Sequence, residues 1–314
     1  MHAQGREFQI IRDYFQCQAL TSPQVILGIG DDCALIAPRA GYLQAISVDT
    51  SVAGCHFPAD ASAFDIAYRA LNVSLSDLAA MGADAQFFTL ALTLPDVDEH
   101  WLQAFSEGLF RAAANARVVL AGGDTTRGPL SITVQVHGDL PAGTALLRSG
   151  AQVGDYLYVS GCLGDAAAGL KAYQQGDEQP ELLRAYLRPE PQLVLGQQLR
   201  ALASSCIDIS DGLLADAGHI LAASGVAASI DLESMPLSPA LCSYLPYSQA
   251  LALALTGGDD YQLCFTSHLA PEVLGIEGVY CIGRIQAGSG LQLLNPPAGF
   301  TLDKTGFDHF DERI

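Results

Sequence analysis

Four short stretches of the sequence place aspartates beside glycines after apolar runs. They are residues 28–33 (GIGDDC), 121–128 (AGGDTTRG), 206–212 (CIDISDG) and 255–261 (LTGGDDY). Glycine lets the backbone come close to a ligand, and two neighbouring carboxylates repel each other by about 4 kcal/mol at about 4 Å near a protein surface. Such stretches therefore favour the binding of a cation or of a metal-bound phosphate. Glycine and aspartate are also ordinary turn residues, so a solvated turn is the alternative for any one stretch alone.

Two further aspartates lie outside these stretches. Asp49 follows a predicted strand at 43–48, and α/β folds tend to place ligands at the carboxyl ends of strands. Asp77 lies on a predicted helix that begins at Ser62, within about 30° of its apolar stripe. A charge on a buried face needs a partner or a metal, and no Lys or Arg lies within a turn of Asp77; the alternative is a solvated position at the rim. His56 is either a substrate contact or a turn histidine, and its spacing favours neither.

Together these carboxylates form a set of hard oxygen ligands. The set is Asp31, Asp32, Asp49, Asp77, Asp124, Asp208 and Asp211. Mg²⁺ binds such ligands, keeps several waters and usually bridges a few carboxylates to substrate phosphates. The sequence therefore predicts a magnesium site that handles a phosphate. Glycine amides and arginines such as Arg127 and Arg148 complete the expected phosphate contacts.

The charge balance narrows the expected partners. The 314 residues carry 15 basic and 34 acidic side chains, a formal charge of −19, and no cluster of Lys and Arg marks a nucleic-acid surface. The two lysines, Lys171 and Lys304, follow no glycine-rich loop, so the lysine of a Walker A phosphate site is missing. Phosphate binding is therefore expected to depend on metal ions, and neither a nucleic acid nor a membrane is an expected partner.

Location and size give two broader expectations. Charged residues interrupt residues 1–15, which argues against a signal-peptide core, and no apolar run approaches the ~18 residues of a membrane span. The eight cysteines form no CxxC pair, as expected of free thiols in a reducing compartment. We therefore expect a cytoplasmic protein. A chain of this length is also expected to form two domains.

Alternating strand and helix patterns must position these residues. Helices are predicted at 5–19, 62–82, 96–116 and 213–223, with a short one inside the loop 177–191. Strands are predicted at 43–48, 87–94, 117–120, 130–136 and 156–159. Ser62 and Asp65 resemble a capping box, and the glycines before Asp165 mark a helix start that favours anions. This order predicts an α/β fold of the α+β type, with a domain break near residue 142.

Other ligand-binding and catalytic motifs fail on spacing. The pair Gly28 and Gly30 lacks the third glycine of a dinucleotide fingerprint, because Cys33 stands there. Residues 208–212 resemble a calcium loop, yet the glycine comes one residue early and His219 stands where a bidentate glutamate belongs. No Gly-x-Ser-x-Gly is present, which argues against a serine hydrolase.

Taken in order, the motifs resemble the thiamine-monophosphate kinase family over essentially the whole chain. They are GIGDDCALI (28–36), SVDTSVAGCHF (47–57), NVSLSDLAAMGA (72–83), AGGDTTRGPLS (121–131), RSGA (148–151), IDISDGL (207–213), TGGDDYQLCF (256–265) and GFDHF (306–310). The resemblance implies a two-domain aminoimidazole ribonucleotide synthetase-like fold with mixed sheets flanked by helices. It also implies ATP as co-substrate, several Mg²⁺ ions and a homodimer. Residues 1–142 would form the N-terminal metal, ATP-binding and dimerisation domain, and 143–314 the C-terminal domain that completes the nucleotide and substrate site.

The implied reaction is the ATP- and Mg²⁺-dependent phosphorylation of thiamine monophosphate to thiamine diphosphate by direct in-line transfer, the last step of thiamine diphosphate biosynthesis. By position, the resemblance implies metal ligands at Asp32, Ser47, Asp49, Asp77, Asp124, Asp208 and Asp211. It implies nucleotide contacts at Asp32, Val48, Gly123, Asp124, Arg148 and Ser210. It implies thiamine contacts at His56, Asp259 and Phe307, and catalytic roles for Asp77, Asp124, Arg148 and Asp208.

Several positions depart from the family pattern. Val48 replaces a common threonine, so a nucleotide contact there must come from its backbone. Asp259 and Gln262 replace the glutamates of GGEDYE, and the shorter Asp259 would lengthen the substrate contact or bridge it through water. Phe307 stands where tyrosine is also common, and a stacking role survives that change. The rival hypotheses are a sister ATP-dependent synthetase with a different pocket and a non-catalytic metal- or nucleotide-binding protein, although the complete acid set argues against lost activity.

Overall fold

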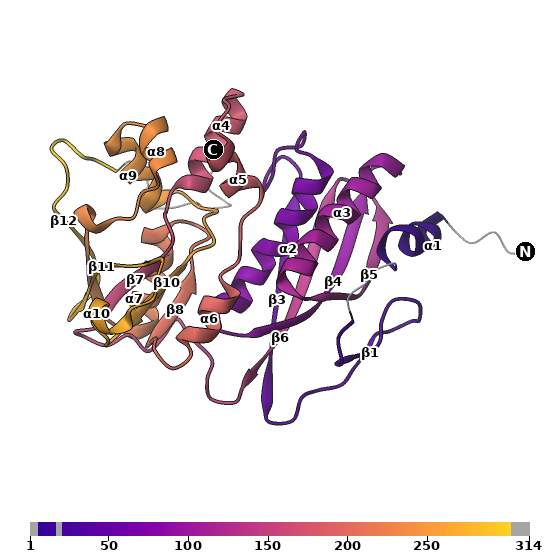
Figure 1. The fold of residues 1–314 in the computed structure, drawn as a ribbon, viewed down its shortest axis with the longest axis horizontal. Coiled ribbons are helices and arrows are strands. Elements are labelled where there is room, and N and C mark those ends of the chain that lie inside the picture. Colours follow the sequence, from indigo (N-terminus) through magenta and orange to yellow (C-terminus); the bar gives the residue numbers. More distant parts are fainter. Residues whose placement is uncertain (1–5, 17–20, 303–314) are drawn as a thin grey trace, which may run out of the picture. The chain divides into compact units, whose positions relative to one another are not determined.

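The computed structural model of the chain describes residues 6–16 and 21–302, and these divide into two compact units. The first unit comprises the described residues up to 78 together with 83–143, and the second comprises 79–82 and 144–302. Each unit is built around its own mixed sheet (Figure 1). The predicted thiamine contact Phe307 and the GFDHF motif lie outside the described residues.

The first unit is a four-stranded sheet with two long helices on one face. Its strands are β3 (Tyr42–Val52), β4 (Asp84–Leu94), β5 (Val119–Arg127) and β6 (Ser131–Pro141), in the order β3-β6-β4-β5. The β4–β5 pairing is parallel and the others are antiparallel. Helices α2 (Ala63–Ala80) and α3 (Glu99–Ala116) lie side by side (Figure 1), touching where Gly108 meets the backbone of Phe64. The short pair β1 (Val25–Leu27) and β2 (Leu35–Ile36) packs against Phe87, Val119 and Ala121 of the sheet.

Local signals determine where the two long helices begin and end. The Ser62 hydroxyl oxygen accepts a hydrogen bond from the backbone N–H of Asp65 (3.1 Å) and donates one to the Asp65 carboxylate (2.6 Å), as the capping pattern predicts. Asp98 caps α3 by accepting from two backbone N–H groups, so the helix predicted from residue 96 begins at Glu99. Arg117 ends α3 in the left-handed conformation, with φ of 57°.

The second glycine–aspartate stretch is a strand and not a turn. β5 continues to Arg127, so residues 122–127 pair with β4, and Asp124 lies opposite Ala91. A Cβ atom on Gly123 would lie 1.9 Å from the carbonyl oxygen of Leu90. Glycine therefore serves the close approach of two strand backbones here, and the predicted strand 117–120 is too short.

Two other elements differ in length from their predictions. β3 extends to Val52, so Asp49 lies inside a strand, opposite Val134, and does not follow its end. The N-terminal helix predicted at 5–19 is α1 (Arg6–Ile10) followed by a π-helical turn, η1 (Ile11–Phe15), in the described residues. Phe15 at its end is buried and lies edge-on to Phe105 of α3, as a packing helix requires.

The second unit is a six-stranded sheet flanked by shorter helices. Its strands are β7 (Tyr156–Ser160), β8 (Ser205–Asp208), β9 (Ala227–Asp231), β10 (Leu263–Ser267), β11 (Val279–Gln286) and β12 (Gly290–Leu294), in the order β12-β9-β11-β7-β10-β8. Its helices are α4 (Asp165–Gln175), α5 (Pro180–Leu187), α6 (Leu193–Leu199), α7 (Leu213–Ser224), η2 (Leu232–Ser234), α8 (Pro239–Tyr244), α9 (Tyr247–Thr256) and α10 (Pro271–Leu274). Buried Val159, Ile207 and Leu213 join β7, β8 and α7 in one core. The predicted strand 156–159 and the helix at 213–223 correspond to β7 and α7, and the fourth glycine–aspartate stretch follows a helix, α9.

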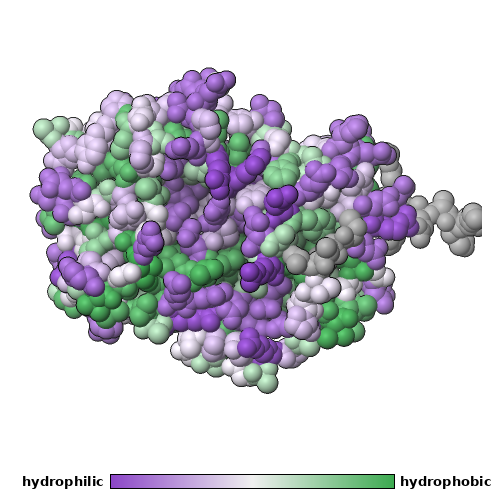
Figure 2. Space-filling view, viewed as in Figure 1, coloured by the Kyte–Doolittle hydropathy of each residue, from purple (hydrophilic) through white to green (hydrophobic). Residues whose placement is uncertain are grey.

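The surface mixes polar and apolar residues. Figure 2 shows hydrophilic residues interspersed with apolar ones over the face in view. β3 exposes Leu43, Ile46 and Val48, which are 53%, 55% and 57% exposed. No helix within residues 6–16 and 21–302 combines the length and the apolar character that crossing a membrane requires. The seven cysteines of this part of the chain are free thiols.

Candidate functional site

A cavity of about 420 Å³ in the first unit joins two of the four acidic stretches. The residues 28–34 form one wall, and residues 120–125 of β5 form another, so Asp32 and Asp124 line the same space. Both aspartates are exposed. Gly30 adopts φ of 128°, which an L side chain rarely adopts, so this wall requires glycine there. The structure thus brings a flexible glycine turn and two carboxylates together, as a metal-bound phosphate would need.

The adjacent aspartates of the first stretch have different surroundings. Asp31 Oδ1 accepts a hydrogen bond from the backbone N–H of Asp32 at 2.8 Å. This bond gives the Asp31 carboxylate a local role in shaping the turn. The Asp32 carboxylate remains the predicted metal ligand of the pair.

A second acidic pair lies between β3 and α2. Ser47 donates its hydroxyl hydrogen to Asp77 Oδ2. Burial raises the pKa of Asp49, and the nearby charge of Asp77 raises it further, while a hydrogen bond with Ser74 lowers it. Asp77 is half-buried and bonded to Ser47, so it is not fully solvated at the helix rim. A pair of like charges with a neighbouring hydroxyl has the donor chemistry that Mg²⁺ accepts.

The predicted metal ligands do not form one cluster within the part of the chain that the structure describes. No group of three His, Cys, Asp or Glu residues there is arranged to hold a metal ion. The first unit instead offers Asp32 and Asp124 on the cavity and Asp49 and Asp77 between β3 and α2. A shared metal site for all of these residues remains a prediction.

The backbone of the third acidic stretch bonds to Asp216, an aspartate to which the sequence analysis gave no role. Asp208 ends β8 and is 6% exposed. Beyond it, Asp216 Oδ2 accepts hydrogen bonds from the backbone N–H groups of Ser210, Asp211 and Gly212 at 3.0, 3.0 and 3.1 Å. Asp216 is 2% exposed, and burial raises its pKa to about 6 although these hydrogen bonds oppose the shift. The sequence contains one sign of this role, since Asp216 is an acidic residue in the first turn of the helix predicted at 213–223, where carboxylates are favoured.

The fourth stretch is joined to the third by backbone hydrogen bonds. The N–H of Asp259 donates to the carbonyl of Ser210 (2.9 Å), and the N–H of Tyr261 donates to that of Ile209 (2.8 Å). Asp259 and Tyr261 have φ of 73° and 49°, which are uncommon for non-glycine residues. The Tyr261 hydroxyl donates to Asp259 Oδ1 at 3.1 Å. The backbone of Asp259, a predicted thiamine contact, is therefore held by a hydrogen bond to Ser210, and its carboxylate accepts from the Tyr261 hydroxyl.

The helix start predicted to favour anions is bonded to the protein's own carboxylate. Asp260 accepts hydrogen bonds from Gly164 N (2.6 Å) and Ala166 N (3.2 Å) at the beginning of α4. Burial raises the pKa of Asp260 to about 8, against the effect of these two bonds. The acceptor at this N-terminus is thus a side-chain carboxyl group, and a bound phosphate is not needed to satisfy its N–H groups.

Two further predicted contacts, His56 and Arg148, and the departing residue Gln262 have hydrogen-bond partners within the chain. His56 Nδ1 accepts from the backbone N–H of Val52 at 3.1 Å, so this histidine stabilises the turn after β3. Gln262 Oε1 accepts from the Ser160 hydroxyl (2.7 Å), so the family's glutamate position here contacts the end of β7. Arg148 is exposed, and its carbonyl oxygen accepts from Ser224 (3.4 Å). Val48 is also exposed.

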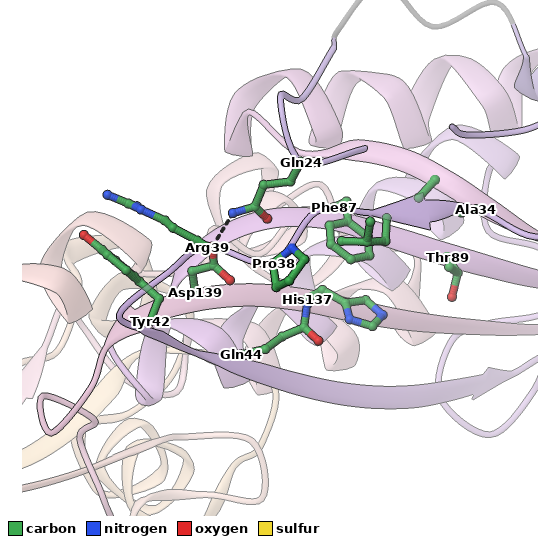
Figure 3. A pocket seen from close by; sticks show the side chains of 12 residues that line it. Gln24, Ala34, Pro38, Arg39, Tyr42, Gln44, Phe87, Thr89, His137 and Asp139 are labelled. Atoms are coloured by element: carbon green, nitrogen blue, oxygen red, sulfur yellow. Dashed lines mark hydrogen bonds between the residues drawn. The ribbon is translucent and has the colours of Figure 1, made fainter. Parts of the chain in front are cut away.

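A second cavity of about 420 Å³ in the first unit contains none of the predicted site residues (Figure 3). The Phe87 and His137 rings stack in it, with centroids 4.3 Å apart, and burial lowers the pKa of His137. Arg39 lies over the Tyr42 ring at 3.5 Å. Gln24 donates to the buried Asp139 across the cavity (Figure 3). Gln24 and Asp139 are thus partners within the chain, whereas the buried His137 Nδ1 has no hydrogen-bond partner among the residues that the structure describes.

Two domain families match this arrangement. Residues 30–140 match the AIR synthase related protein, N-terminal domain, and residues 152–292 match the AIR synthase related protein, C-terminal domain. The matches and the two mixed sheets flanked by helices define an AIR synthase-related protein, which confirms the predicted fold class.

Individual relatives identify the family within this class of proteins. The thiamine-monophosphate kinase of Escherichia coli (strain K12) is 49% identical over 97% of this chain and 98% of its own. The crystal structure of thiamine-monophosphate kinase from Stenotrophomonas maltophilia K279a matches with a TM-score of 0.83 and 45% identity, covering 90% of this chain and 95% of that one. The structure of AaThiL complexed with AMPPCP and TMP matches with a TM-score of 0.78 and 30% identity, covering 90% and 92%. The chain therefore belongs to the thiamine-monophosphate kinase family, as its motifs predict.

Proposed function

We propose that this protein transfers the γ-phosphoryl group of ATP to thiamine monophosphate, giving thiamine diphosphate and ADP. The transfer is direct and in-line, depends on Mg²⁺, and is the last step of thiamine diphosphate biosynthesis. The observation that carries the proposal is the similarity along nearly the whole chain to thiamine-monophosphate kinases, including a relative complexed with AMPPCP, an ATP analogue, and TMP. The cavity that joins Asp32 and Asp124 beside glycine backbone supports it.

Carboxylate and hydroxyl oxygens would hold the magnesium ions. The residues are Asp32, Ser47, Asp49, Asp77, Asp124, Asp208 and Asp211. Their chemistry fits Mg²⁺, because Asp49 and Asp77 are like charges close enough to shift a pKa, and a cation between them would relieve the repulsion. Bound Mg²⁺ supplies neutralisation of the negative charge that shifts between phosphates during transfer.

The chain's own groups would bind and orient the two substrates. The nucleotide contacts are Gly123, Arg148, Ser210 and the backbone of Val48, and the thiamine contacts are His56, Asp259 and Phe307. A phosphate oxygen of thiamine monophosphate forms the new bond to the γ-phosphorus, and the bond to the bridging oxygen of ADP breaks. The acceptor phosphate is already largely ionised near neutral pH, so no general base is needed. Asp77, Asp124, Arg148 and Asp208 carry the transfer by positioning and charge.

The proposal includes a cytoplasmic homodimer. Ile46 and Val48 of β3 support the dimer, since both are more than half exposed on a strand at the sheet edge, and exposed apolar patches mark interfaces. Residues 1–142 would form the metal-binding and dimerisation domain, and 143–314 would complete the nucleotide and substrate site. Sedimentation of the wild type and of Ile46→Lys tests this part. A wild type that sediments as a monomer would contradict it.

One assay tests the reaction. The purified protein with ATP, Mg²⁺ and thiamine monophosphate should form thiamine diphosphate and ADP in equal amounts, and chelation of Mg²⁺ should stop both. ATP chirally labelled at the γ-phosphorus should give inverted configuration in the product, as a single in-line step requires. ADP formed only with another acceptor would indicate a sister synthetase. Tight Mg·ATP binding without turnover would indicate a binding protein.

A further inference from the structure

We propose that two buried carboxylates, Asp216 and Asp260, are positioning residues that separately fix the nucleotide side and the thiamine side of the site residues in the second unit. The inference rests on the proposed function, in which Ser210 and Asp211 contact nucleotide and metal and Asp259 contacts thiamine. Neither Asp216 nor Asp260 stands at a position to which the family resemblance gives a role.

Asp216 holds the backbone of the third acidic stretch. One oxygen atom, Oδ2, accepts from the consecutive N–H groups of Ser210, Asp211 and Gly212, all within 3.1 Å. Consecutive N–H groups converge on one atom when the backbone curls around it, and such a curl is an anion-binding nest. Here a carboxylate from the first turn of α7 fills the nest. The directions in which the Ser210 and Asp211 side chains leave the backbone therefore depend on Asp216.

Asp260 holds the fourth stretch from another direction. Its two oxygens bond to Gly164 N and Ala166 N at the start of α4, and the residue is 8% exposed. The residues on either side, Asp259 and Tyr261, both have positive φ. Non-glycine residues persist in that conformation when the surrounding structure holds them there. The anchored side chain between the two supplies that restraint, so the direction of Asp259 depends on Asp260.

Substitutions of Asp216 and of Asp260 are expected to affect the two substrates separately. Asp216 bonds to the residues that carry the nucleotide and metal contacts, whereas Asp260 lies beside the thiamine contact. The backbone hydrogen bonds from Asp259 to Ser210 and from Tyr261 to Ile209 join main-chain atoms and use neither the Asp216 nor the Asp260 carboxyl group. Loss of the Asp216 carboxyl group should therefore displace the third stretch more than the fourth. Loss of the Asp260 carboxyl group should displace the fourth more than the third.

The test compares Asp216→Asn and Asp260→Asn with Asp155→Asn as a matched control. Asp155 is 4% exposed, and its carboxylate accepts from the N–H of Gln152 (3.0 Å) in a turn without predicted contacts. Steady-state kinetics give kcat, KM for Mg·ATP and KM for thiamine monophosphate, and thermal melting gives stability. We expect Asp216→Asn to raise KM for Mg·ATP by about fivefold or more and Asp260→Asn to raise KM for thiamine monophosphate by a similar factor, with the other KM changed less than about twofold.

A purely structural role predicts a different result. Both KM values would then change together in each variant, or neither would change, while all three variants lost thermal stability, and either outcome overturns the inference. If an Asn variant does not fold, Asp216→Glu and Asp260→Glu keep the carboxyl group but displace it by a methylene, and the same separation of KM values is expected. Wild-type turnover tests the proposed function independently. If the wild type binds Mg·AMPPCP and thiamine monophosphate without turnover, calorimetric Kd values of the variants must show the same separation.

Discussion

Two aspartates of the first unit and two of the second have opposite surroundings. In the first, Asp32 and Asp124 are exposed on a cavity that also exposes glycine backbone. In the second, Asp216 and Asp260 are buried and bonded to backbone N–H groups. A buried carboxylate is stable only with such partners, and one whose oxygens are bonded in this way has less capacity left for a cation. In the first unit Asp32 and Asp124 are therefore accessible to a ligand, whereas in the second unit Asp216 and Asp260 shape the loops that carry the predicted contacts.

The largest expected effect concerns the backbone that carries the acids of the first unit. Gly123→Ala should destabilise the protein by about 3 kcal/mol or more, because the added Cβ would lie 1.9 Å from the Leu90 carbonyl oxygen and the strands cannot separate without loss of their hydrogen bonds. Gly122→Ala is the matched control, since nothing lies within 4 Å of a Cβ there. Urea unfolding of both variants measures the difference. Equal stabilities of the two variants would show that β5 does not require glycine where its backbone approaches Leu90 of β4.

Next in size is the effect on turnover of removing one charge from each acidic pair in the first unit. Asp77→Asn and Asp124→Asn should each lower kcat by at least about tenfold, roughly 1.4 kcal/mol in the activation barrier, because each removes a predicted metal ligand. Asp31→Asn should lower kcat much less, since Asp31 Oδ1 bonds to the Asp32 backbone and an amide oxygen can replace it. Near-normal rates for Asp77→Asn and Asp124→Asn would remove the argument that the first unit keeps its acids for metal.

A buried carboxylate of the second unit should make stability depend on pH. The pKa of Asp260 is raised to about 8 in the folded protein, mainly by burial and further by the charges of Asp165 and Asp259, and the Cys162 thiol also lies near it. The folded state therefore keeps a proton that the unfolded state releases. This contribution to stability is complete below the ordinary carboxyl pKa and is lost as pH rises toward about 8.

Asp260→Asn isolates this effect. Between pH 6 and pH 7 the free energy of unfolding of the wild type should fall by up to about 1.4 kcal/mol relative to that of the variant. Urea denaturation at both pH values provides the measurement. Parallel pH profiles for the two proteins would mean that Asp260 does not titrate in this range, and that the contrast between the two units is weaker than we infer.

The smallest effect is expected where the chain departs from its family. Gln262→Glu restores the common glutamate but keeps the oxygen that accepts from Ser160, so KM for thiamine monophosphate should change by less than about twofold. Steady-state kinetics at saturating Mg·ATP provide the measurement. A markedly lower KM in the variant would assign this position to the substrate and not to the contact with Ser160 of β7.

Features with local signals were predictable from the sequence. The start of α2 was predicted because Ser62 and Asp65 are three residues apart and bond within one turn. α7 was predicted because a mostly apolar segment, 213–223, follows Gly212. The family and its fold followed from motifs that occur in order along the whole chain, and the matches to both domain families confirm them.

Features that depend on distant segments were not predictable. The glycines of 121–128 suggest a turn until Leu90 of β4 is placed against Gly123. Asp260 looks like a duplicate of Asp259 until the start of α4 is brought to it. In both cases the deciding contact joins residues far apart in sequence, and neither periodicity nor spacing reports such contacts.

The antiparallel pairing of β8 with β10 has a consequence for how the protein acquires its site. Leu263 lies opposite Asp208, so the third and fourth acidic stretches meet at one end of this ladder although α7, β9, α8 and α9 separate them along the chain. Closing so long a loop costs chain entropy before the contacts compensate it. A folding intermediate that lacks β10 would therefore have no joined loops in the second unit, and binding competence there should arise in the same cooperative step as the sheet.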